Sequence, residues 1–309
     1  MVEATNVAYV FPGQGAQWAG MGRDLYDSFA AAKAVFRQAD EVLGFPLSKL
    51  CFEGPEEELR QTINAQPAIL TVSFACLGAA REVNSGLPPA RFMAGHSLGE
   101  YTALAASGML DFKNAVHLAR ERGRLMHEAG TIRPGGMAAV IGLEETPLRE
   151  VCQRTGIYIV NINSPGQMVI SGDRYDVAKA MEIAKDRGAA RVIPLSVSGA
   201  FHTPLMQPAV EGMTEILSRL TFADPATPIV ANVTARPLTT AQAVKEELVQ
   251  QLCHCVQWQR SVEYMIGEGV TTFVEIGPGK VLTGLIKRIN REVQTLNIGD
   301  AAAVSSRPA

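Results

Sequence analysis

The chain has 309 residues, which is enough for one large domain with an insertion or for two domains. Hydrophobic residues make up 47% and charged residues 19% of the chain, a composition that is typical of a folded globular protein and excludes a largely disordered one. With 28 basic and 31 acidic residues the net charge is -3, so no general positive field is available to hold nucleic acid.

The composition also predicts a cytoplasmic protein without a membrane span. The longest apolar stretch, Ala68 to Ala80, is interrupted by polar residues and falls short of the roughly 20 residues that cross a bilayer. No basic segment precedes the first apolar run, so we expect no secretory signal. The five cysteines are odd in number and mostly far apart, which favours a reducing compartment. Their one cluster, Cys253-His254-Cys255, lacks the second ligand pair that a zinc site needs.

The first half of the chain alternates strands, glycine turns and helices. A β-rich run over residues 7–11 enters the turn Pro12-Gly13-Gln14-Gly15, and helical patterns follow at 24–43 and 64–82. A second buried strand at 92–94 enters Gly95-His96-Ser97-Leu98-Gly99 and an alanine-rich helix. A strand, a sharp glycine turn and a helix in this order predict an α/β fold.

After Gly136 the predicted elements become shorter. Strands are expected at 137–141, 157–162, 168–171 and 191–197, and helices at 146–154 and 175–187. The order β-α-β-β-α-β within about 60 residues is that of a ferredoxin-like unit. We therefore expect an inserted ferredoxin-like subdomain over 129–198, within a core formed by 1–128 and 199–309.

The chain then returns to the core. It has predicted strands at 229–233 and 271–276 and predicted helices at 244–253 and 281–289. The last residues, 301–309, are small and polar and predict a frayed tail.

Gly95-His96-Ser97-Leu98-Gly99 fits the Gly-x-Ser-x-Gly pattern in its usual context, between a strand and a helix. Such an elbow holds its serine in a strained backbone region and exposes the hydroxyl at the edge of the sheet. We expect Ser97 to be a nucleophile. The alternative is an ordinary turn in which Ser97 caps the helix.

A nucleophilic serine needs a base, and the chain has five histidines. His96 adjoins Ser97, but consecutive residues of a sharp elbow point apart. His202 lies in the junction after the inserted unit, and such loops can reach across a cleft. We expect His202 to be the base. The alternative is a capped imidazole on the surface.

Arg122 lies within the apolar stripe of a helix, whereas Arg120 and Arg124 point roughly opposite to it. The stripe consists of Ala115, Leu118, Ala119, Met126 and Ala129. A guanidinium that faces the core must find an anion, because an unpaired buried charge is costly. Either an internal Asp or Glu pairs with Arg122, or the guanidinium binds the carboxylate of a substrate.

The glycine-rich loops fail the tests for nucleotide binding. Trp18 occupies the third glycine position of the dinucleotide pattern, and Gly279-Lys280-Val281 lacks the Ser or Thr of a phosphate-binding loop. The backbone amides of Gln14 and of Leu98, the residue after the nucleophile, could instead form an oxyanion hole.

These segments closely resemble the malonyl-CoA:acyl carrier protein transacylase family of fatty acid synthesis, whose relatives are the acyltransferase domains of polyketide synthases. The resemblance covers roughly residues 7 to 290. It rests on the motifs Phe11-Pro12-Gly13-Gln14-Gly15, Gly95-His96-Ser97-Leu98-Gly99-Glu100, Arg122-Gly123-Arg124, Gly199-Ala200-Phe201-His202 and Val274-Glu275-Ile276-Gly277-Pro278-Gly279.

The resemblance implies an α/β-hydrolase-like core with a parallel sheet and a ferredoxin-like insertion. It implies that Ser97 is acylated, that His202 is its base and that Arg122 binds the malonyl carboxylate. It also assigns the amide of Gln14 to the oxyanion hole.

Two further roles are implied by the resemblance alone. The main chain around Gln257 would orient the histidine in place of a triad acid, and Phe201 would favour malonyl over methylmalonyl groups. Cys255 and Ala200 stand where many relatives have proline, so the local loop geometry differs from theirs while the polar groups remain.

The implied activity is ping-pong transfer of a malonyl group from malonyl-CoA to the phosphopantetheine thiol of acyl carrier protein. No metal, other cofactor, nucleic acid or membrane is expected to take part, and the family favours a monomer. One alternative is a serine hydrolase or thioesterase, which would have no use for Arg122 in its pocket. A binding module without catalysis is a second alternative, and the presence of both Ser97 and His202 argues against it.

Overall fold

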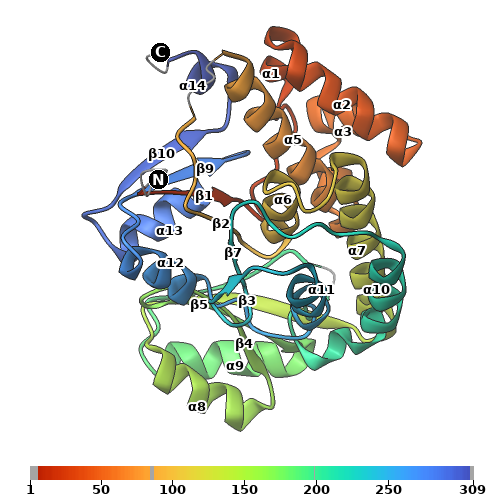
Figure 1. Cartoon of the computed structure of the whole chain (residues 1–309). Coiled ribbons are helices and arrows are strands. Elements are labelled where there is room, and N and C mark those ends of the chain that lie inside the picture. Colours follow the sequence, from red (N-terminus) through yellow and green to blue (C-terminus); the bar gives the residue numbers. More distant parts are fainter. Residues whose placement is uncertain (1–5, 84–86, 198, 307–309) are drawn as a thin grey trace.

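The computed structural model describes residues 6–83, 87–197 and 199–306. Within these residues the strands form two sheets, and helices cover both (Figure 1). The larger sheet has the order β10-β9-β1-β2-β7-β8, and only its edge pair β7 and β8 is antiparallel. The predicted α/β class with a parallel sheet is therefore confirmed. The strands of this sheet are β1 (Val7–Phe11), β2 (Phe92–Gly95), β7 (Ile229–Val230), β8 (Pro237–Leu238), β9 (Thr272–Ile276) and β10 (Gln294–Ile298).

The helices of this larger part pack on both faces of the sheet. They are α1 (Arg23–Ser28), α2 (Ala30–Leu43), α3 (Leu47–Glu53), α4 (Glu56–Arg60), α5 (Thr62–Val83), α6 (Leu98–Ala106), α7 (Phe112–Ile132), α10 (Gln207–Arg219), α11 (Ala241–Gln250), α12 (Trp258–Gly267), α13 (Val281–Ile289) and α14 (Ala301–Ser305), with a short 3-10 turn at Pro204–Met206.

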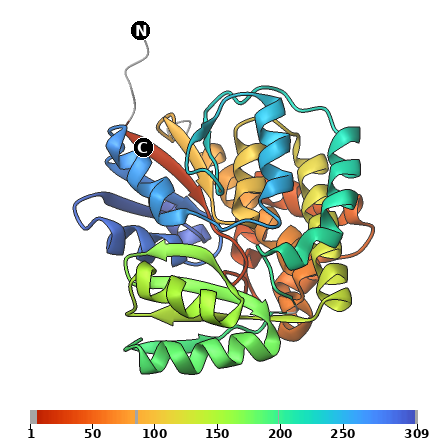
Figure 2. The same ribbon diagram turned by 90° about the horizontal axis from the view of Figure 1, so that it is seen from below.

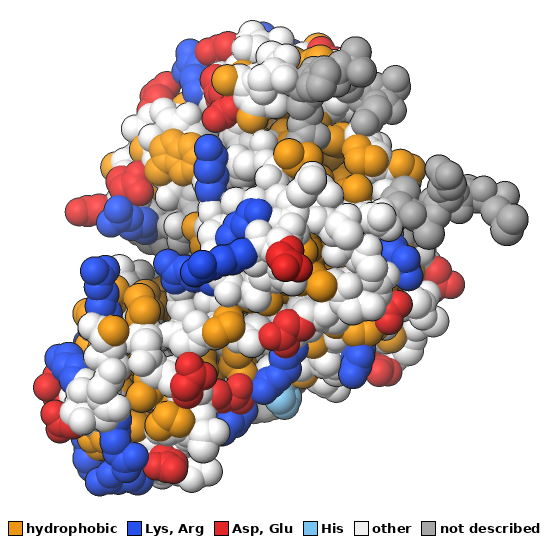
Figure 3. Space-filling view, turned by 90° about the vertical axis from the view of Figure 1, so that its left-hand side faces the viewer, with side chains coloured by type: hydrophobic (Ala, Val, Ile, Leu, Met, Phe, Trp, Pro, Cys, Tyr) orange, Lys and Arg blue, Asp and Glu red, His pale blue; other side chains and the backbone are white. Residues whose placement is uncertain are grey.

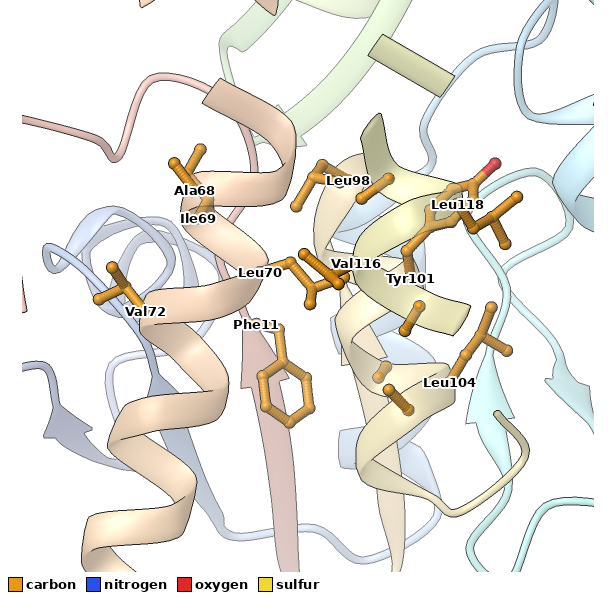
Figure 4. Close-up of a cluster of buried hydrophobic side chains, with 14 of the residues drawn as sticks. Phe11, Ala68, Ile69, Leu70, Val72, Leu98, Tyr101, Leu104, Val116 and Leu118 are labelled. Atoms are coloured by element: carbon orange, nitrogen blue, oxygen red, sulfur yellow. The ribbon is translucent and has the colours of Figure 1, made fainter. Parts of the chain in front are cut away.

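Strand β1 shows why the central strands are apolar throughout. Ala8 and Val10 belong to a cluster with α12 and α13, whereas Tyr9 and Phe11 belong to the main core with α2, α5, α6 and α7. Alternate residues of a strand point to opposite faces, so a sheet that is covered on both sides needs apolar residues at every position. Figure 4 shows Leu70 of α5 and Tyr101 of α6 in the main core, together with Phe11.

Helix α5 is long and apolar enough to cross a membrane by length and composition. It has 22 residues, and the mean hydropathy of its most apolar window is 1.4. However, 83% of that window is buried inside the protein, where the helix packs against α2 and α7. Burial on all sides accounts for the uniform apolarity of this helix.

The smaller sheet is formed by one continuous segment with its own core. Its order is β4-β5-β3-β6, and its pairs are all antiparallel. Helices α8 and α9 pack together on this sheet, away from the large one (Figures 1 and 2). The predicted boundary residue 198 lies outside the described residues. The elements are β3 (Gly135–Ile141), α8 (Glu145–Thr155), β4 (Tyr158–Ser164), β5 (Gln167–Asp173), α9 (Arg174–Asp186) and β6 (Arg191–Pro194).

Two expectations about local structure were wrong. The predicted helix at 24–43 is two helices, because Phe29 adopts an extended backbone and the carboxylate of Glu82 accepts hydrogen bonds from the first amides of α2. The predicted frayed tail contains the helix α14, whose cap residue Asp300 accepts a hydrogen bond from the Ala303 amide. Residues 307–309 lie outside the described residues.

Candidate active site

Ser97 lies on a sharp turn between β2 and α6. Its backbone has φ 52° and ψ −105°, a conformation that L residues rarely adopt. The turn is possible only because neighbouring backbones come very close to glycines. A Cβ atom on Gly99 would lie 2.0 Å from the Phe11 carbonyl oxygen, and one on Gly95 would lie 1.9 Å from the carbonyl carbon of Gly99. The turn therefore has the sharp strand-to-helix geometry that its Gly-x-Ser-x-Gly pattern predicts, and Ser97 makes no side-chain cap.

Asn232 holds this elbow on both sides of the serine. Its Oδ1 accepts a hydrogen bond from the Ser97 amide at 2.7 Å, and its Nδ2 donates to the Gly95 carbonyl at 2.7 Å. Sequence patterns did not single out this residue. The available signal was its place near the end of the predicted buried strand at 229–233, because polar residues of parallel sheets gather around a site at the ends of strands.

The side chain of His202 faces the serine. Its Nε2 lies 2.8 Å from Ser97 Oγ, and its Nδ1 lies 2.7 Å from the carbonyl oxygen of Gln251. A carbonyl oxygen can only accept, so Nδ1 carries the proton and the lone pair of Nε2 faces the hydroxyl. Burial, with a smaller effect from the cation of Arg122, lowers the pKa of His202 to about 3. The imidazole is thus neutral near pH 7 and able to accept a proton.

The remaining histidines are not directed at Ser97. His96 Nε2 lies 2.8 Å from the side-chain oxygen of Asn163 in β4, so this ring points away from the serine toward the small sheet. His117, His127 and His254 are exposed. Of the five candidates, the fold brings only His202 within hydrogen-bond distance of Ser97.

The structure corrects the assignment of Gln257. The carbonyl that contacts His202 belongs to Gln251, directly after the end of α11. Gln257 instead precedes α12, where its amide donates to the Asn232 carbonyl at 2.7 Å and its side chain accepts from Arg260. The two glutamines lie in one connecting segment, and only the direction in which the chain leaves α11 decides which carbonyl faces the histidine.

Arg122 lies in the core side of α7, as its place in the apolar stripe predicts, and is only 1% exposed. Its Nη2 donates to Ser97 Oγ at 3.1 Å and to Gln251 Oε1 at 2.7 Å. Its Nη1 donates to Gln66 Oε1 at 2.7 Å. The ring of Tyr101 lies 5.0 Å from the guanidinium carbon, which gives the cation a further favourable contact.

Among the described residues, no Asp or Glu side chain forms an ion pair with Arg122, and its Nε has no hydrogen-bond partner. The acid that acts on its charge is Glu100, and the Gln251 side chain lies between the two. The alternative in which an internal carboxylate pairs directly with the guanidinium is therefore not what these residues form. A buried cation held by neutral amides, beside a serine, is suited to binding an anionic group attached to that serine.

The loop that carries Gln14 lies against the elbow. A Cβ atom on Gly13 would be 2.2 Å from the His96 carbonyl oxygen, so this loop and the elbow are in backbone contact. The side-chain Oε1 of Gln14 accepts from Thr62 Oγ1 at 2.8 Å. Leu98 is the first residue of α6, where helix amides lack internal partners. Both amides assigned to the oxyanion hole thus belong to segments that meet at Ser97.

Phe201 precedes His202 and is 5% exposed, so its ring is part of the main core. Across the residues that the structure describes, no group of three or more His, Cys, Asp or Glu side chains could hold a metal ion. Cys253, His254 and Cys255 therefore do not assemble into a metal centre with other described ligands.

Comparison with known families places this site among acyltransferases. The family described as the acyl transferase domain matches residues 8–306. The chain belongs to this family. The resemblance found in the sequence motifs is thereby confirmed, and it extends over nearly the whole chain.

Among its relatives in this acyltransferase family is the malonyl CoA-acyl carrier protein transacylase of Bacillus subtilis (strain 168), which is 47% identical over 97% of this chain and 95% of that protein. The protein of the same name from Escherichia coli (strain K12) is 42% identical over 98% of each chain.

Solved structures agree with these relatives. An acyl-carrier-protein-S-malonyltransferase from Bartonella henselae has a TM-score of 0.94 and 40% identity, with 98% of each chain covered. A malonyl-transacylase in complex with its type II PKS acyl-carrier protein has the same TM-score, identity and coverage.

Proposed function

We propose that this acyltransferase moves a malonyl group from malonyl-CoA to the phosphopantetheine thiol of acyl carrier protein, through an ester on Ser97. One observation carries the choice of acyl group. The buried cation of Arg122 lies 3.1 Å from the serine oxygen and forms no direct ion pair with an acid among the described residues. A malonyl group on Ser97 would bring its free carboxylate to this cation.

The hydrogen bonds support a two-step mechanism. Nε2 of His202 takes the proton of Ser97 as Oγ attacks the thioester carbonyl, and the amides of Gln14 and Leu98 stabilise the oxyanion. The intermediate collapses to the acyl ester, and the CoA thiolate leaves with the proton from the imidazolium. The carrier thiol then attacks the ester, gives its proton to His202 and takes the malonyl group, which restores the Ser97 hydroxyl.

The carbonyl of Gln251 takes the place of a triad acid in this scheme. It holds the Nδ1 proton of His202 and so keeps the lone pair of Nε2 toward the serine. A neutral carbonyl does not stabilise an imidazolium as a carboxylate would. The base consequently stays neutral at rest, which agrees with the lowered pKa of His202.

The surface supports an acidic protein partner. Acyl carrier proteins are typically acidic, and Figure 3 shows several Lys and Arg side chains along the notch between the upper and lower parts of the molecule, with Asp and Glu side chains beside them. Complementary charge of this kind raises the rate of association even when the net charge of the protein is -3. The carrier can belong to fatty acid or to polyketide synthesis, because the same chemistry serves both.

Three further properties belong to this proposal. The order of elements and strands in the smaller sheet supports a ferredoxin-like subdomain over 129–198, inserted into an α/β-hydrolase-like core of 1–128 and 199–309. The five free cysteines support a cytoplasmic location. We infer a monomer from the resemblance to the family, and an enzyme that needs no metal or other cofactor, since the proposed chemistry uses only protein groups.

The competing function is hydrolysis of the acyl-enzyme, as in a thioesterase. The test is to load the enzyme with malonyl-CoA in the presence and absence of phosphopantetheinylated carrier, and to measure malonyl carrier and free malonate separately. Transfer to the carrier should greatly exceed release of malonate. Equal rates of the two reactions would favour the hydrolase.

A further inference from the structure

A buried acidic residue, Glu100, lies in the first turn of α6, directly after Ser97. Glu100 in α6 is completely buried, and both of its oxygens accept hydrogen bonds from groups of the site. Oε1 accepts from the backbone amide of Asn232 at 2.9 Å, and Oε2 accepts from the side-chain amide of Gln251. Burying a carboxyl group costs free energy, so two hydrogen bonds from residues of the site indicate that Glu100 has a role beyond packing.

The contact to Gln251 fixes the orientation of an amide beside Arg122. Nε2 of Gln251 donates to Glu100 and to the Ser97 carbonyl at 3.0 Å, which leaves Oε1 to accept from Arg122. In the reversed orientation, the amide N–H groups would face the guanidinium donors and the amide oxygen would face the carboxylate and the Ser97 carbonyl. Neither arrangement of like groups can form hydrogen bonds, so Glu100 and the Ser97 carbonyl together determine which atom of Gln251 Arg122 contacts.

The contact to Asn232 reaches the serine from the other side. The Asn232 side chain holds the backbone at Ser97 and Gly95, and its own amide is held by Oε1 of Glu100. Glu100 therefore begins two chains of hydrogen bonds, which we call arms. The first arm runs through the Gln251 side chain to Arg122, and the second runs through Asn232 to the turn at Ser97.

We propose that Glu100 is a positioning residue that sets Arg122 for acyl donors with a free carboxylate, acting through the side chain of Gln251. This inference rests on the proposed function of malonyl transfer. Glu247 is a second buried acid nearby. Its Oε1 accepts from the backbone amide of Val233 at 2.7 Å, and among the described residues its side chain forms no hydrogen bond with the side chains of Gln251 or Arg122. Burial and the neighbouring Glu247 raise the pKa of Glu100, while its hydrogen bonds from Asn232 and Gln251 oppose this effect.

The test is the isosteric change Glu100→Gln. The remaining carbonyl oxygen can still accept from the Asn232 amide, but the new NH₂ group faces the amide of Gln251, so the arm toward Arg122 is lost and the elbow is kept. Leaving the buried Gln251 amide donor without its acceptor costs enough that we expect the ratio of malonyl-CoA to acetyl-CoA kcat/KM to fall about 10- to 100-fold. Labelling of Ser97 by a fluorophosphonate, which needs no carboxylate site, should stay within about threefold of wild type.

The matched control is Glu247→Gln, which makes the same isosteric change in the same buried region and keeps the hydrogen bond from Val233. Its malonyl to acetyl ratio should equal that of the wild type. A double-mutant cycle with Gln251→Ala supplies the test of mechanism, because two residues that act through one arm are not additive. In the Gln251→Ala background, Glu100→Gln should lower the ratio by less than about threefold.

An unchanged ratio in Glu100→Gln, or additive losses in the cycle, would overturn the inference. If Glu100→Gln does not fold, Gln251→Ala removes the same arm from its other end and must lower the ratio by itself. A wild-type enzyme that forms no malonyl ester on Ser97 would instead defeat the proposed function. Normal loading of the wild type with an unchanged ratio in the variants would defeat only the role of Glu100.

Discussion

Replacing Arg122 by Ala tests which acyl group the site is built for. In the free enzyme the guanidinium donates to two neutral amide oxygens and to Ser97 Oγ, and it forms no direct ion pair with an acid among the described residues. The malonyl carboxylate would therefore form its charge pair in a desolvated site. Removing one partner of such a pair costs on the order of 3–5 kcal/mol, which is roughly two to four orders of magnitude in malonyl kcat/KM.

Acetyl-CoA has no carboxylate, so Arg122→Ala should change its kcat/KM little. The quantity to report is the ratio of malonyl to acetyl kcat/KM, measured with one carrier preparation, because this ratio cancels any loss of folded enzyme. Arg124→Ala is the control. It removes the same charge from the same helix, where Arg124 forms surface ion pairs with Glu121 and Glu128, and should leave the ratio unchanged. A parallel fall for both donors in Arg122→Ala would refute the reasoning and make Arg122 a purely structural residue.

The remaining predictions concern the base, the oxyanion loop and acyl selectivity. Because burial lowers the pKa of His202 to about 3, kcat/KM should show no inflection near 6.5, and an acid limb centred there would contradict this environment. Between pH 6.5 and about 3 the imidazole of His202 is protonated in the unfolded chain but not in the folded protein. His202 therefore lowers the stability of the fold as the pH falls through this range. His202→Gln should reduce the drop in Tm that acid causes. Gly13→Ala would place a Cβ atom 2.2 Å from the His96 carbonyl oxygen and displace the loop that carries Gln14. This variant should lower kcat by about 100-fold or more, while circular dichroism shows that the protein is still folded. A normal kcat would show that the Gln14 amide is not part of the oxyanion hole. Phe201→Ser should raise the methylmalonyl to malonyl ratio of kcat/KM by about tenfold, and an unchanged ratio would show that Phe201 does not set selectivity.

The parts of the site that sequence could predict are those fixed by local pattern. The elbow follows from glycines at set distances from Ser97, and the inward position of Arg122 follows from the helical period. The two strands and turns of the core, at 7–15 and 92–99, were predicted for the same reason, since apolar runs that end at glycine carry their own signal.

The parts that sequence could not predict depend on contacts between distant segments. Gln251 and Gln257 are alike in type and neighbourhood, and only the end of α11 determines which carbonyl reaches His202. Asn232 and Glu100 are 132 positions apart in the chain, and a hydrogen bond between such distant residues produces no periodic pattern in the sequence. A buried acid in an otherwise apolar helix was the one available hint for Glu100.

The most direct test of the central claim is the identity of the acylated residue. The enzyme is exposed briefly to malonyl-CoA, and intact mass and peptide mapping locate the adduct. We expect one malonyl group, on the peptide that carries Ser97. It should be absent in Ser97→Ala and should be discharged when phosphopantetheinylated carrier protein is added. An adduct on a cysteine, or one that persists in Ser97→Ala, would contradict it.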